Sequence, residues 1–166
     1  SYFGNRKTPD RGVLEVTFDS NGTKWKLFNL HLKSKWTERK DDPEANVRRE
    51  KEARAIRDYL RKSNPPGSNP RYLVVGDFND HRNSAPLRRF LQVNDTVLTT
   101  MVHCEDSRGH RWTHHWAKAD SYSRFDYILA TPPMLKQLVL GSAKIVDGPN
   151  SALASDHRMI FADFQF

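Results

Sequence analysis

The sequence predicts a single domain, residues 1–166, of the α/β or layered α+β class. Three observations support this fold class. Apolar and polar residues alternate at 14–18 as in a half-buried strand, and apolar residues recur at helical spacing within 43–62. Residues 72–75 form an uninterrupted apolar run, typical of a central strand covered on both faces. Because strands and helices are mixed along the chain, we expect both hairpin and crossover connections.

A hairpin is predicted at the start of the chain. The alternating strand at 14–18 is followed by Asn-Gly at 21–22, which suits a two-residue hairpin turn, and a second strand is expected over 25–32. The helix at 43–62 comes next, and the Pro- and Gly-rich stretch at 63–70 stops it.

The remaining predicted elements are shorter than these. After the central strand at 72–75 we expect a short helix at 86–92, a strand at 125–130, a helical turn at 132–138, and closing strands at 144–146 and 159–166. The stretch between the short helix and Tyr122 is rich in aromatic and histidine residues, and it is expected to be irregular.

The charge balance indicates a phosphate-rich partner. The chain carries 27 Lys and Arg against 20 Asp and Glu, a net charge of +7. Clustered cations gain affinity for a polyanion by releasing its counterions, so nucleic acid is a candidate partner, and a soluble basic surface is the alternative. No apolar run approaches the ~20 residues of a membrane span, and no signal peptide is visible. We therefore expect a soluble chain without membrane insertion, of unknown location.

Polar side chains gather at the ends of the predicted strands. They are His31, Asp77, Asn79, Asp126, Asp156 and His157. Ligand crevices form beyond strand ends in layered α/β proteins, so these groups can converge. Carboxylates can hold a hard cation and deprotonate a water, while imidazoles and amides bind phosphoryl oxygens, a set that suits phosphoester hydrolysis.

Each of these residues also has a structural alternative. Asp77 and Asn79 can bond the backbone of the turn that follows a strand, and Asp156 can cap the segment after Ser155. His31 on its own could be a packed or surface histidine. The argument for chemistry rests on the combination of these residues.

Four motifs, taken in order, resemble a known family. They are Asn29-Leu30-His31-Leu32-Lys33-Ser34, Gly76-Asp77-Phe78-Asn79, Asp126-Tyr127-Ile128-Leu129 and Ser155-Asp156-His157. In this order they resemble the endonuclease/exonuclease/phosphatase superfamily, which includes pancreatic deoxyribonuclease, repair endonucleases of the exonuclease III type, sphingomyelinases and inositol-polyphosphate phosphatases. The resemblance runs from about Arg11 to the C-terminus. It implies part of a four-layer α/β/β/α sandwich with mixed, largely antiparallel sheets.

The resemblance implies a role for each residue that matches a motif. His31 would contact the scissile phosphate, Asp77 would orient or deprotonate the attacking water, and Asn79 would hydrogen-bond the phosphate. The reaction would be a one-step in-line displacement at phosphorus without a covalent intermediate.

The last two motifs would complete the site. Asp156 would take part in metal binding, with Asp77 as the other candidate ligand, and the cation would be Mg²⁺ or else Mn²⁺ or Ca²⁺. His157 would stabilise the pentacovalent transition state, and Asp126 would orient this histidine.

Four further residues are candidates for substrate binding. Arg49 resembles part of the family's helix and could be aimed at phosphate, although a salt bridge within the helix is an equal alternative. Arg111, Trp112 and Arg124 are expected in a loop on the substrate side, where aromatic rings stack on bases and guanidinium groups meet phosphate. A plain packing role for Trp112 stays open.

A structural zinc site is the rival interpretation of the histidine-rich stretch. Cys104, His110 and His114 offer suitable ligand types. Their spacing fits no standard zinc finger and a single thiolate is available, so we do not expect zinc. One cysteine also excludes a scaffold of internal disulfides.

The chain departs from the family in its length. Family members are longer, and their first half supplies an Asn and a metal-binding Glu for which this chain has no counterpart. The chain therefore resembles the C-terminal portion of such an enzyme. An apolar sheet surface would then lack its cover, so we expect a homodimer or association with the missing N-terminal half.

Three functional hypotheses remain from the sequence. The first is a divalent-metal-dependent phosphodiesterase acting on nucleic acid as an endonuclease or exonuclease. The second is a phosphatase or phosphodiesterase for a lipid or small phosphate ester. The third is a catalytically incompetent fragment that binds nucleic acid without cleaving it.

Overall fold

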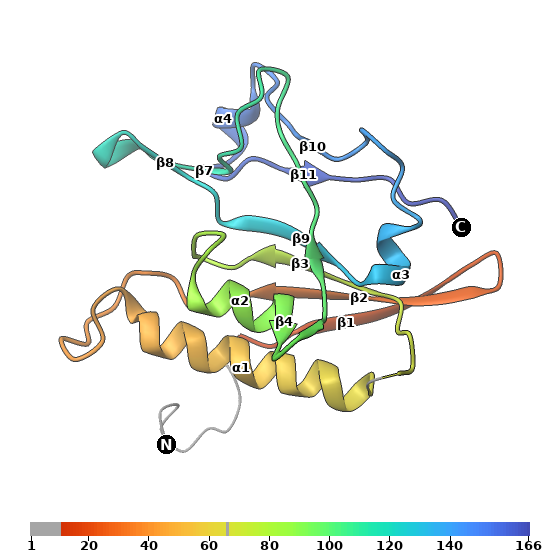
Figure 1. Cartoon of the computed structure of the whole chain (residues 1–166). Helices are drawn as coiled ribbons and strands as arrows, with labels where there is room; N and C mark the ends of the chain where they lie inside the picture. Colours follow the sequence, from red (N-terminus) through yellow and green to blue (C-terminus); the bar gives the residue numbers. More distant parts are fainter. Residues whose placement is uncertain (1–10, 66) are drawn as a thin grey trace.

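A five-stranded mixed sheet organises the molecule. The computed structural model describes residues 11–65 and 67–166. The sheet has the strand order β1-β2-β3-β9-β6, from β1 (Leu14–Ser20), β2 (Thr23–His31), β3 (Tyr72–Asp77), β9 (Asp126–Ala130) and β6 (Thr100–Met101). Strands β2 and β3 are parallel and the other three neighbouring pairs are antiparallel, so the expected class of sheet is confirmed (Figure 1).

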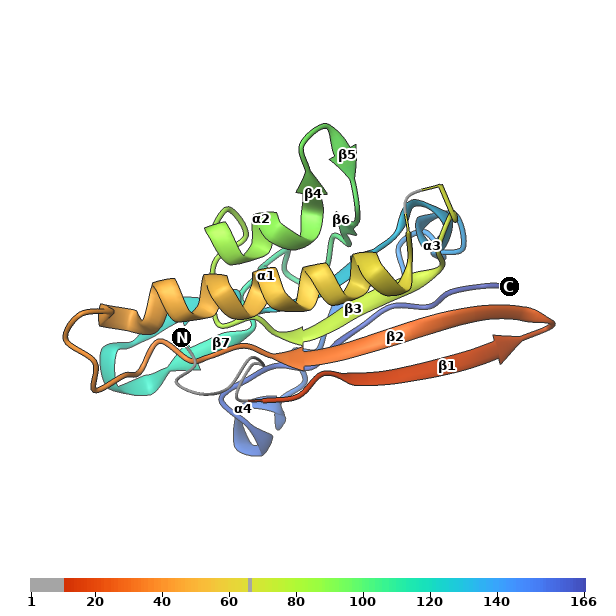
Figure 2. The same cartoon turned by 90° about the horizontal axis from the view of Figure 1, so that it is seen from below.

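Two helices cover one face of this sheet. Helix α1 (Asn46–Ser63) forms the crossover between the parallel strands β2 and β3, and α2 (Ala85–Leu91) lies beside it (Figure 2). Alternate residues of β2, among them Phe28 and Leu30, pack with the apolar stripe of α1, including Ile56. These side chains are 0–4% exposed, and their burial stabilises this side of the sheet.

Helix α1 begins three residues later than the sequence predicts. Pro43–Ala45 form a short 3₁₀ turn, η1, in which Glu44 and Ala45 have φ of 60° and 52°. The two carboxylate oxygens of Asp42 accept the backbone N–H groups of Val47, at 2.9 Å, and Arg48, at 3.0 Å. Asp42 therefore satisfies the first free N–H groups of α1, and the helix starts where this cap places it.

The other face of the sheet is covered by the segment that follows β9. It contains α3 (Pro132–Leu135), β10 (Lys144–Ile145), α4 (Ser151–Ala154) and β11 (Ile160–Phe161), and Figure 1 shows β10 and β11 on the side away from α1. A second apolar cluster lies beneath this segment and includes Leu73, Ile128 and Met134. The cover stops short of β1, where Leu14 is 59% and Phe18 40% exposed.

Two predicted elements are corrected by the structure. The closing strand expected at 159–166 is reduced to the two residues of β11, because β11 pairs only with the equally short β10 among the described residues. The expected irregular stretch contains two small hairpins, one formed by β4 (Gln92–Val93) and β5 (Thr96–Val97), the other by β7 (His114–Trp116) and β8 (Ser121–Ser123). The short turn η2 (Ala117–Ala119) closes the second hairpin.

Across 11–65 and 67–166, the structure contains no helix with the length and apolar character that spanning a membrane requires.

Candidate active site

Three of the expected residues form one row across adjacent strands. In the sheet register His31 of β2 is paired with Asp77 of β3, and Asp77 is paired with Asp126 of β9. The C-terminal ends of the parallel strands β2 and β3 lie at the same edge as the N-terminal end of the antiparallel strand β9. The sheet therefore brings together residues that are up to 95 positions apart (126 − 31) in the sequence. We call these residues the catalytic row.

A glycine makes the close approach of β2 and β3 possible next to this row. Gly76 has φ of +126°, and a Cβ atom at this position would lie 2.0 Å from the backbone oxygen of Leu30. No other residue fits that space, because the neighbouring atom belongs to the backbone. The glycine of the second motif thus sets the position of Asp77.

His31 and Asp77 form a partly buried pair. The His31 Nε2 lies 3.2 Å from the Asp77 Oδ2, and their side chains are 48% and 14% exposed. Burial lowers the pKa of His31, and this outweighs the opposing charge of Asp77. Burial also raises the pKa of Asp77, because the charged carboxylate is poorly solvated there. A carboxylate with a raised pKa is a better proton acceptor, which suits a general base.

Asn79 fixes the orientation of Asp77. It has a left-handed backbone with φ of 52°, and its N–H donates to the Asp77 Oδ1 at 2.7 Å. Its side-chain amide donates to the Asp77 Oδ2 at 2.9 Å and to the Leu32 carbonyl at 3.0 Å. The turn contacts named as the structural alternative are therefore present, and they hold the Asp77 carboxylate at the end of β3.

His157 and Asp126 form a second pair at the site. The His157 Nδ1 lies 2.8 Å from the Asp126 Oδ2, with side-chain exposures of 29% and 17%. The hydrogen bond to Asp126 raises the pKa of His157 despite the opposing effect of burial. Because Nδ1 is directed at the carboxylate, Nε2 is the ring atom left for a ligand, as in other carboxylate–histidine pairs.

Thr113 joins the two segments that carry this pair. Its side chain is fully buried, and its hydroxyl oxygen accepts the N–H groups of Phe125, at 3.0 Å, and Asp126, at 3.1 Å. Its carbonyl accepts the N–H of Arg158 at 2.7 Å, one residue beyond His157. The hairpin β7–β8 thus holds the start of β9 and the Ser-Asp-His motif together.

His114, which the sequence offered as a candidate zinc ligand, is a residue of this site. Its ring packs 4.7 Å from the His157 ring and 5.2 Å from that of Phe125, and its Nε2 lies 3.8 Å from the Asp156 Oδ2. Burial lowers the pKa of His114, and the neighbouring His157 acts in the same direction. The long-range bridge between His114 and His157 places it here, and a contact across that separation cannot be read from the local sequence.

The proposed zinc ligands do not come together. Cys104 is fully buried and bonds the Val102 carbonyl, while His110 lies beside Asp106, with its Nδ1 3.3 Å from the Oδ2. Within the described part of the chain, no group of three His, Cys, Asp or Glu side chains could hold a metal ion.

The donor set fits a hard divalent cation in part. The Asp156 side chain is 71% exposed, and its carboxylate oxygens face solvent beside His114. Both oxygens of Asp77 are already engaged by Asn79 and His31. Asp156 is therefore the better placed of the two candidate ligands. One or two protein carboxylates completed by substrate oxygens and water is an arrangement that Mg²⁺ commonly adopts.

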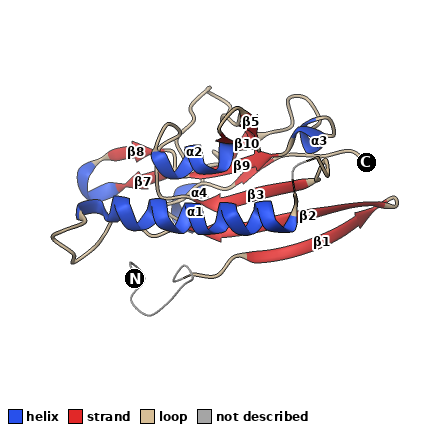
Figure 3. Cartoon of the chain, turned by 60° about the horizontal axis from the view of Figure 1, so that its bottom comes forward, coloured by secondary structure: helices blue, strands red, loops and turns tan. Residues whose placement is uncertain are grey.

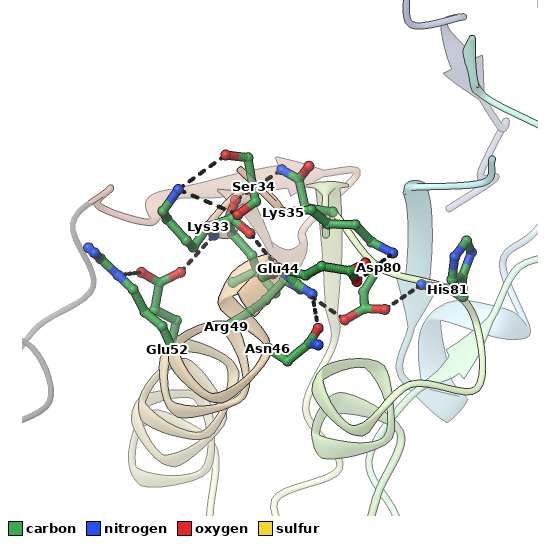
Figure 4. Close-up of polar contacts among 12 residues, drawn as sticks. Lys33, Ser34, Lys35, Glu44, Asn46, Arg49, Glu52, Asp80 and His81 are labelled. Carbon is green, nitrogen blue, oxygen red and sulfur yellow. Dashed lines mark hydrogen bonds and ion pairs between the residues drawn. The ribbon is translucent and has the colours of Figure 1, made fainter. Parts of the chain in front are cut away.

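Arg49 does not face the site, which corrects the expectation that it binds substrate. Its side chain is fully buried, and its Nε donates to the Asp80 Oδ2 at 2.8 Å (Figure 4). Further N–H groups bond the Asn46 side chain at 2.6 Å and the carbonyls of Lys33, at 3.1 Å, and Glu44, at 2.9 Å. Through these contacts Arg49 connects α1, the loop after β2 and the turn after β3.

The other candidate substrate residues share a separate pocket. Arg111, Trp112 and Arg124 line a pocket of about 300 Å³ that includes none of the catalytic row. The Arg124 guanidinium lies 5.1 Å from the Tyr127 ring, and the Arg158 guanidinium covers the Trp112 ring at 3.5 Å. Trp112 therefore has the packing role that the sequence left open.

Fold and site together define a layered α/β protein with paired histidines and carboxylates at one sheet edge. The sequence profile of the Endonuclease/Exonuclease/phosphatase family matches residues 3–157, and the chain belongs to this hydrolase family. The resemblance inferred from the four motifs is confirmed. No curated protein matches the chain.

Solved structures of other proteins share the fold. The human Nocturnin catalytic domain with bound sulfate is 19% identical, with a TM-score of 0.63 over 93% of this chain and 52% of that one. A Staphylococcus aureus beta toxin variant with bound magnesium ions is 19% identical, with a TM-score of 0.60 over 94% and 55%.

Sphingomyelinase C from Streptomyces griseocarneus is a third similar structure, 17% identical, with a TM-score of 0.55 over 93% and 54%. The chain thus spans about half the length of the solved structures that it matches.

Proposed function

We propose that the protein is a divalent-metal-dependent phosphodiesterase that hydrolyses nucleic acid, as an endonuclease or exonuclease. The observation that carries this proposal is the catalytic row beside the His157–Asp126 pair, two imidazole–carboxylate pairs at one sheet edge. The net charge of +7 favours a polyanionic substrate over a neutral one. Membership of a phosphoesterase family supports the reaction type.

In the proposed mechanism the two pairs have different roles at the phosphate. Asp77, with its raised pKa, orients and deprotonates the attacking water, and His31 contacts phosphoryl oxygens. Asn79 holds the Asp77 carboxylate, because both N–H groups of its amide are already donated to Asp77 and to the Leu32 carbonyl. The new P–O bond forms as the bond to the ester oxygen breaks, and that oxygen leaves and takes up a proton from water. His157 presents Nε2–H to the charge that develops on phosphorus oxygens, and Asp126 stabilises its protonated form. A cation held by Asp156, with Asp77 as a further ligand, would neutralise oxygen charge. The magnesium in the beta toxin structure supports Mg²⁺, with Mn²⁺ and Ca²⁺ as alternatives.

The chain is proposed to act together with a partner surface. The exposed apolar side chains of β1 support either association with a preceding half of a longer protein or a homodimer. The half-length coverage of the solved structures favours the first arrangement. Any Glu that such a half supplies would add to the single exposed carboxylate of Asp156.

A lipid or small phosphate ester is the second candidate substrate. The similarity to a sphingomyelinase favours it, because the same catalytic groups can serve another phosphodiester. The third candidate, nucleic-acid binding without cleavage, is favoured by the lack of a three-ligand metal cluster in the described part of the chain.

One experiment separates these candidates. The 166-residue chain is incubated with plasmid DNA, bis(p-nitrophenyl) phosphate or sphingomyelin vesicles, in Mg²⁺, in Mn²⁺ or in EDTA. Asp77→Ala is the test variant, and Asp95→Ala, at an exposed carboxylate in the β4–β5 turn, is the matched control. We expect cleavage of DNA and of the small diester that needs metal, is lost in Asp77→Ala and persists in Asp95→Ala.

Two results would contradict the proposal. Faster hydrolysis of sphingomyelin than of DNA would favour the second candidate. Salt-sensitive retention of DNA without cleavage of any substrate would favour the binding fragment.

A further inference from the structure

A pocket opens directly beside the catalytic row. It has a volume of about 700 Å³ and is lined in part by Asn79 and His114. Asn79 is hydrogen-bonded to Asp77, and His114 is packed against His157, so this pocket adjoins both imidazole–carboxylate pairs. A group covalently attached to a phosphate at the row could therefore extend into it.

Two exposed tryptophans line the same pocket. Trp36, in the loop after β2, is 72% exposed, and Trp116, at the end of β7, is 55% exposed. The loop before α1 and the β7–β8 hairpin lie at the same end of the molecule (Figure 3), and residues of both segments line the pocket. The Lys33 Nζ lies 5.8 Å from the centroid of the Trp36 ring. Because both tryptophans are nevertheless more than half exposed, their indole rings offer stacking surfaces to a planar ligand.

The charges of the pocket favour an anionic ligand. Lys35 and Lys118 line it together with a single acid, Glu44, and the Lys35 Nζ lies 3.7 Å from the Glu44 Oε2. Figure 4 shows Lys35 and Glu44 next to the buried Arg49–Asp80 pair, which anchors this loop. Two lysines disfavour a quaternary ammonium headgroup, although such a cation would otherwise suit an aromatic pocket.

Hydroxyl groups supply the remaining polar contacts. Ser121 and Ser123 of β8 line the pocket, and neither side chain is fully buried. A planar ligand that stacks on indole, carries hydrogen-bonding groups on its edge and is joined to a phosphate matches a nucleotide.

We propose that this pocket binds the nucleobase next to the scissile phosphate, stacked on Trp36 and Trp116. The inference rests on the proposed function, and it assigns base recognition to a surface different from the Arg111–Trp112–Arg124 pocket. The Trp112 ring is already covered by the Arg158 guanidinium, whereas Trp36 and Trp116 are exposed. Both tryptophans lie on segments that also carry site residues, His31 before the loop and His114 in β7. The fold therefore fixes the distance between a base stacked on these tryptophans and a phosphate bound at the catalytic row.

The test uses binding, so it does not depend on catalysis. The 166-residue chain is titrated with adenosine monophosphate or with ribose 5-phosphate, which lacks a base, and the indole N–H signals are followed by heteronuclear NMR. Single substitutions assign the four tryptophan signals. We expect adenosine monophosphate to move the signals of Trp36 and Trp116, and ribose 5-phosphate to leave them in place.

A variant series completes the test. Trp36→Ala/Trp116→Ala should weaken binding of adenosine monophosphate at least about fivefold and leave binding of ribose 5-phosphate unchanged. Both side chains are more than half exposed, so the fold should persist, and Leu140→Ala, at a 93% exposed position, is the matched control.

Three outcomes would overturn the inference. They are equal binding of the two ligands, movement of the Trp112 signal alone, and unchanged adenosine monophosphate affinity in the double variant. Each is distinguishable from failure of the proposed function, which is read from hydrolysis of the base-free diester.

Discussion

Replacement of Arg49 by methionine tests whether this residue is structural or binds substrate. The guanidinium is fully buried and donates to four acceptors, the nearest being Asn46 at 2.6 Å and Asp80 at 2.8 Å. Methionine fills most of the volume but leaves the Asp80 carboxylate, whose side chain is 10% exposed, without its cation. Removing one partner of a buried ion pair lowers the free energy of unfolding by ~3–5 kcal/mol. That is a large fraction of the ~5–15 kcal/mol that stabilises a domain.

Equilibrium urea unfolding followed by circular dichroism measures this loss. Arg54→Met is the matched control, because Arg54 is 55% exposed and pairs with Glu50 four residues away on the same helix. Its loss should be below ~1 kcal/mol. A double-mutant cycle with Asp80→Leu should show coupling of ~2 kcal/mol or more, because removing both charges leaves neither one buried alone.

The reasoning would be refuted by a different pattern of effects. If Arg49→Met lost less than ~1 kcal/mol of unfolding free energy and yet weakened phosphate binding more than about tenfold, Arg49 would be a substrate ligand. The structure predicts the reverse, a large loss of stability.

Three further predictions follow from the site and the sheet. Gly76→Ala should lower the free energy of unfolding, measured by thermal denaturation, by ~3 kcal/mol or more, because its Cβ would lie 2.0 Å from a backbone oxygen of β2. Gly148→Ala is the control, because Gly148 lies in open space and its replacement should change the stability little. Asp126→Asn should lower the pKa of His157 in an NMR titration, since the hydrogen bond to Asp126 raises it. A raised histidine pKa stabilises the fold at acidic pH and the effect fades as pH rises through that pKa, so the variant's stability deficit should be larger near pH 5 than near pH 9. An unchanged pKa would contradict the pairing. Phe18→Ser, on the exposed part of β1, should shift the chain toward monomer in sizing experiments, and a wild-type chain that is already monomeric in dilute solution would count against the dimer.

The fold was largely predictable because its main signals are local. The hairpin turn at Asn21-Gly22, the apolar stripe of α1 and the apolar run of β3 each depend on residues within one element. The start of α1 was misplaced because Asp42 caps the helix through side-chain bonds to Val47 and Arg48, which periodicity does not reveal. The C-terminal strand was overestimated because strand length depends on a partner, and β10 is only two residues long.

The candidate site was predictable to the extent that its residues follow strand ends. The sheet register places His31, Asp77 and Asp126 in one row, as their positions in the predicted strands suggested. The environments of Arg49 and His114 depend on contacts between distant segments. Arg49 meets Asp80 across 31 positions, and His114 pairs with His157 across a bridge. The helical pattern shows that Arg49 faces the core, but it does not show which acceptors its guanidinium contacts.

Because the catalytic row is spread across three strands, the site exists only when the whole domain is folded. The row and His157 come from β2, β3, β9 and the Ser-Asp-His motif. No shorter segment of the chain therefore contains the site. Contacts at such long sequence separation form late, because loop closure must precede them. An anion that binds the assembled row therefore selects the fully folded chain and stabilises all four segments at once by mass action. Such a ligand should therefore slow proteolysis of the whole domain, although it contacts only one edge of the sheet.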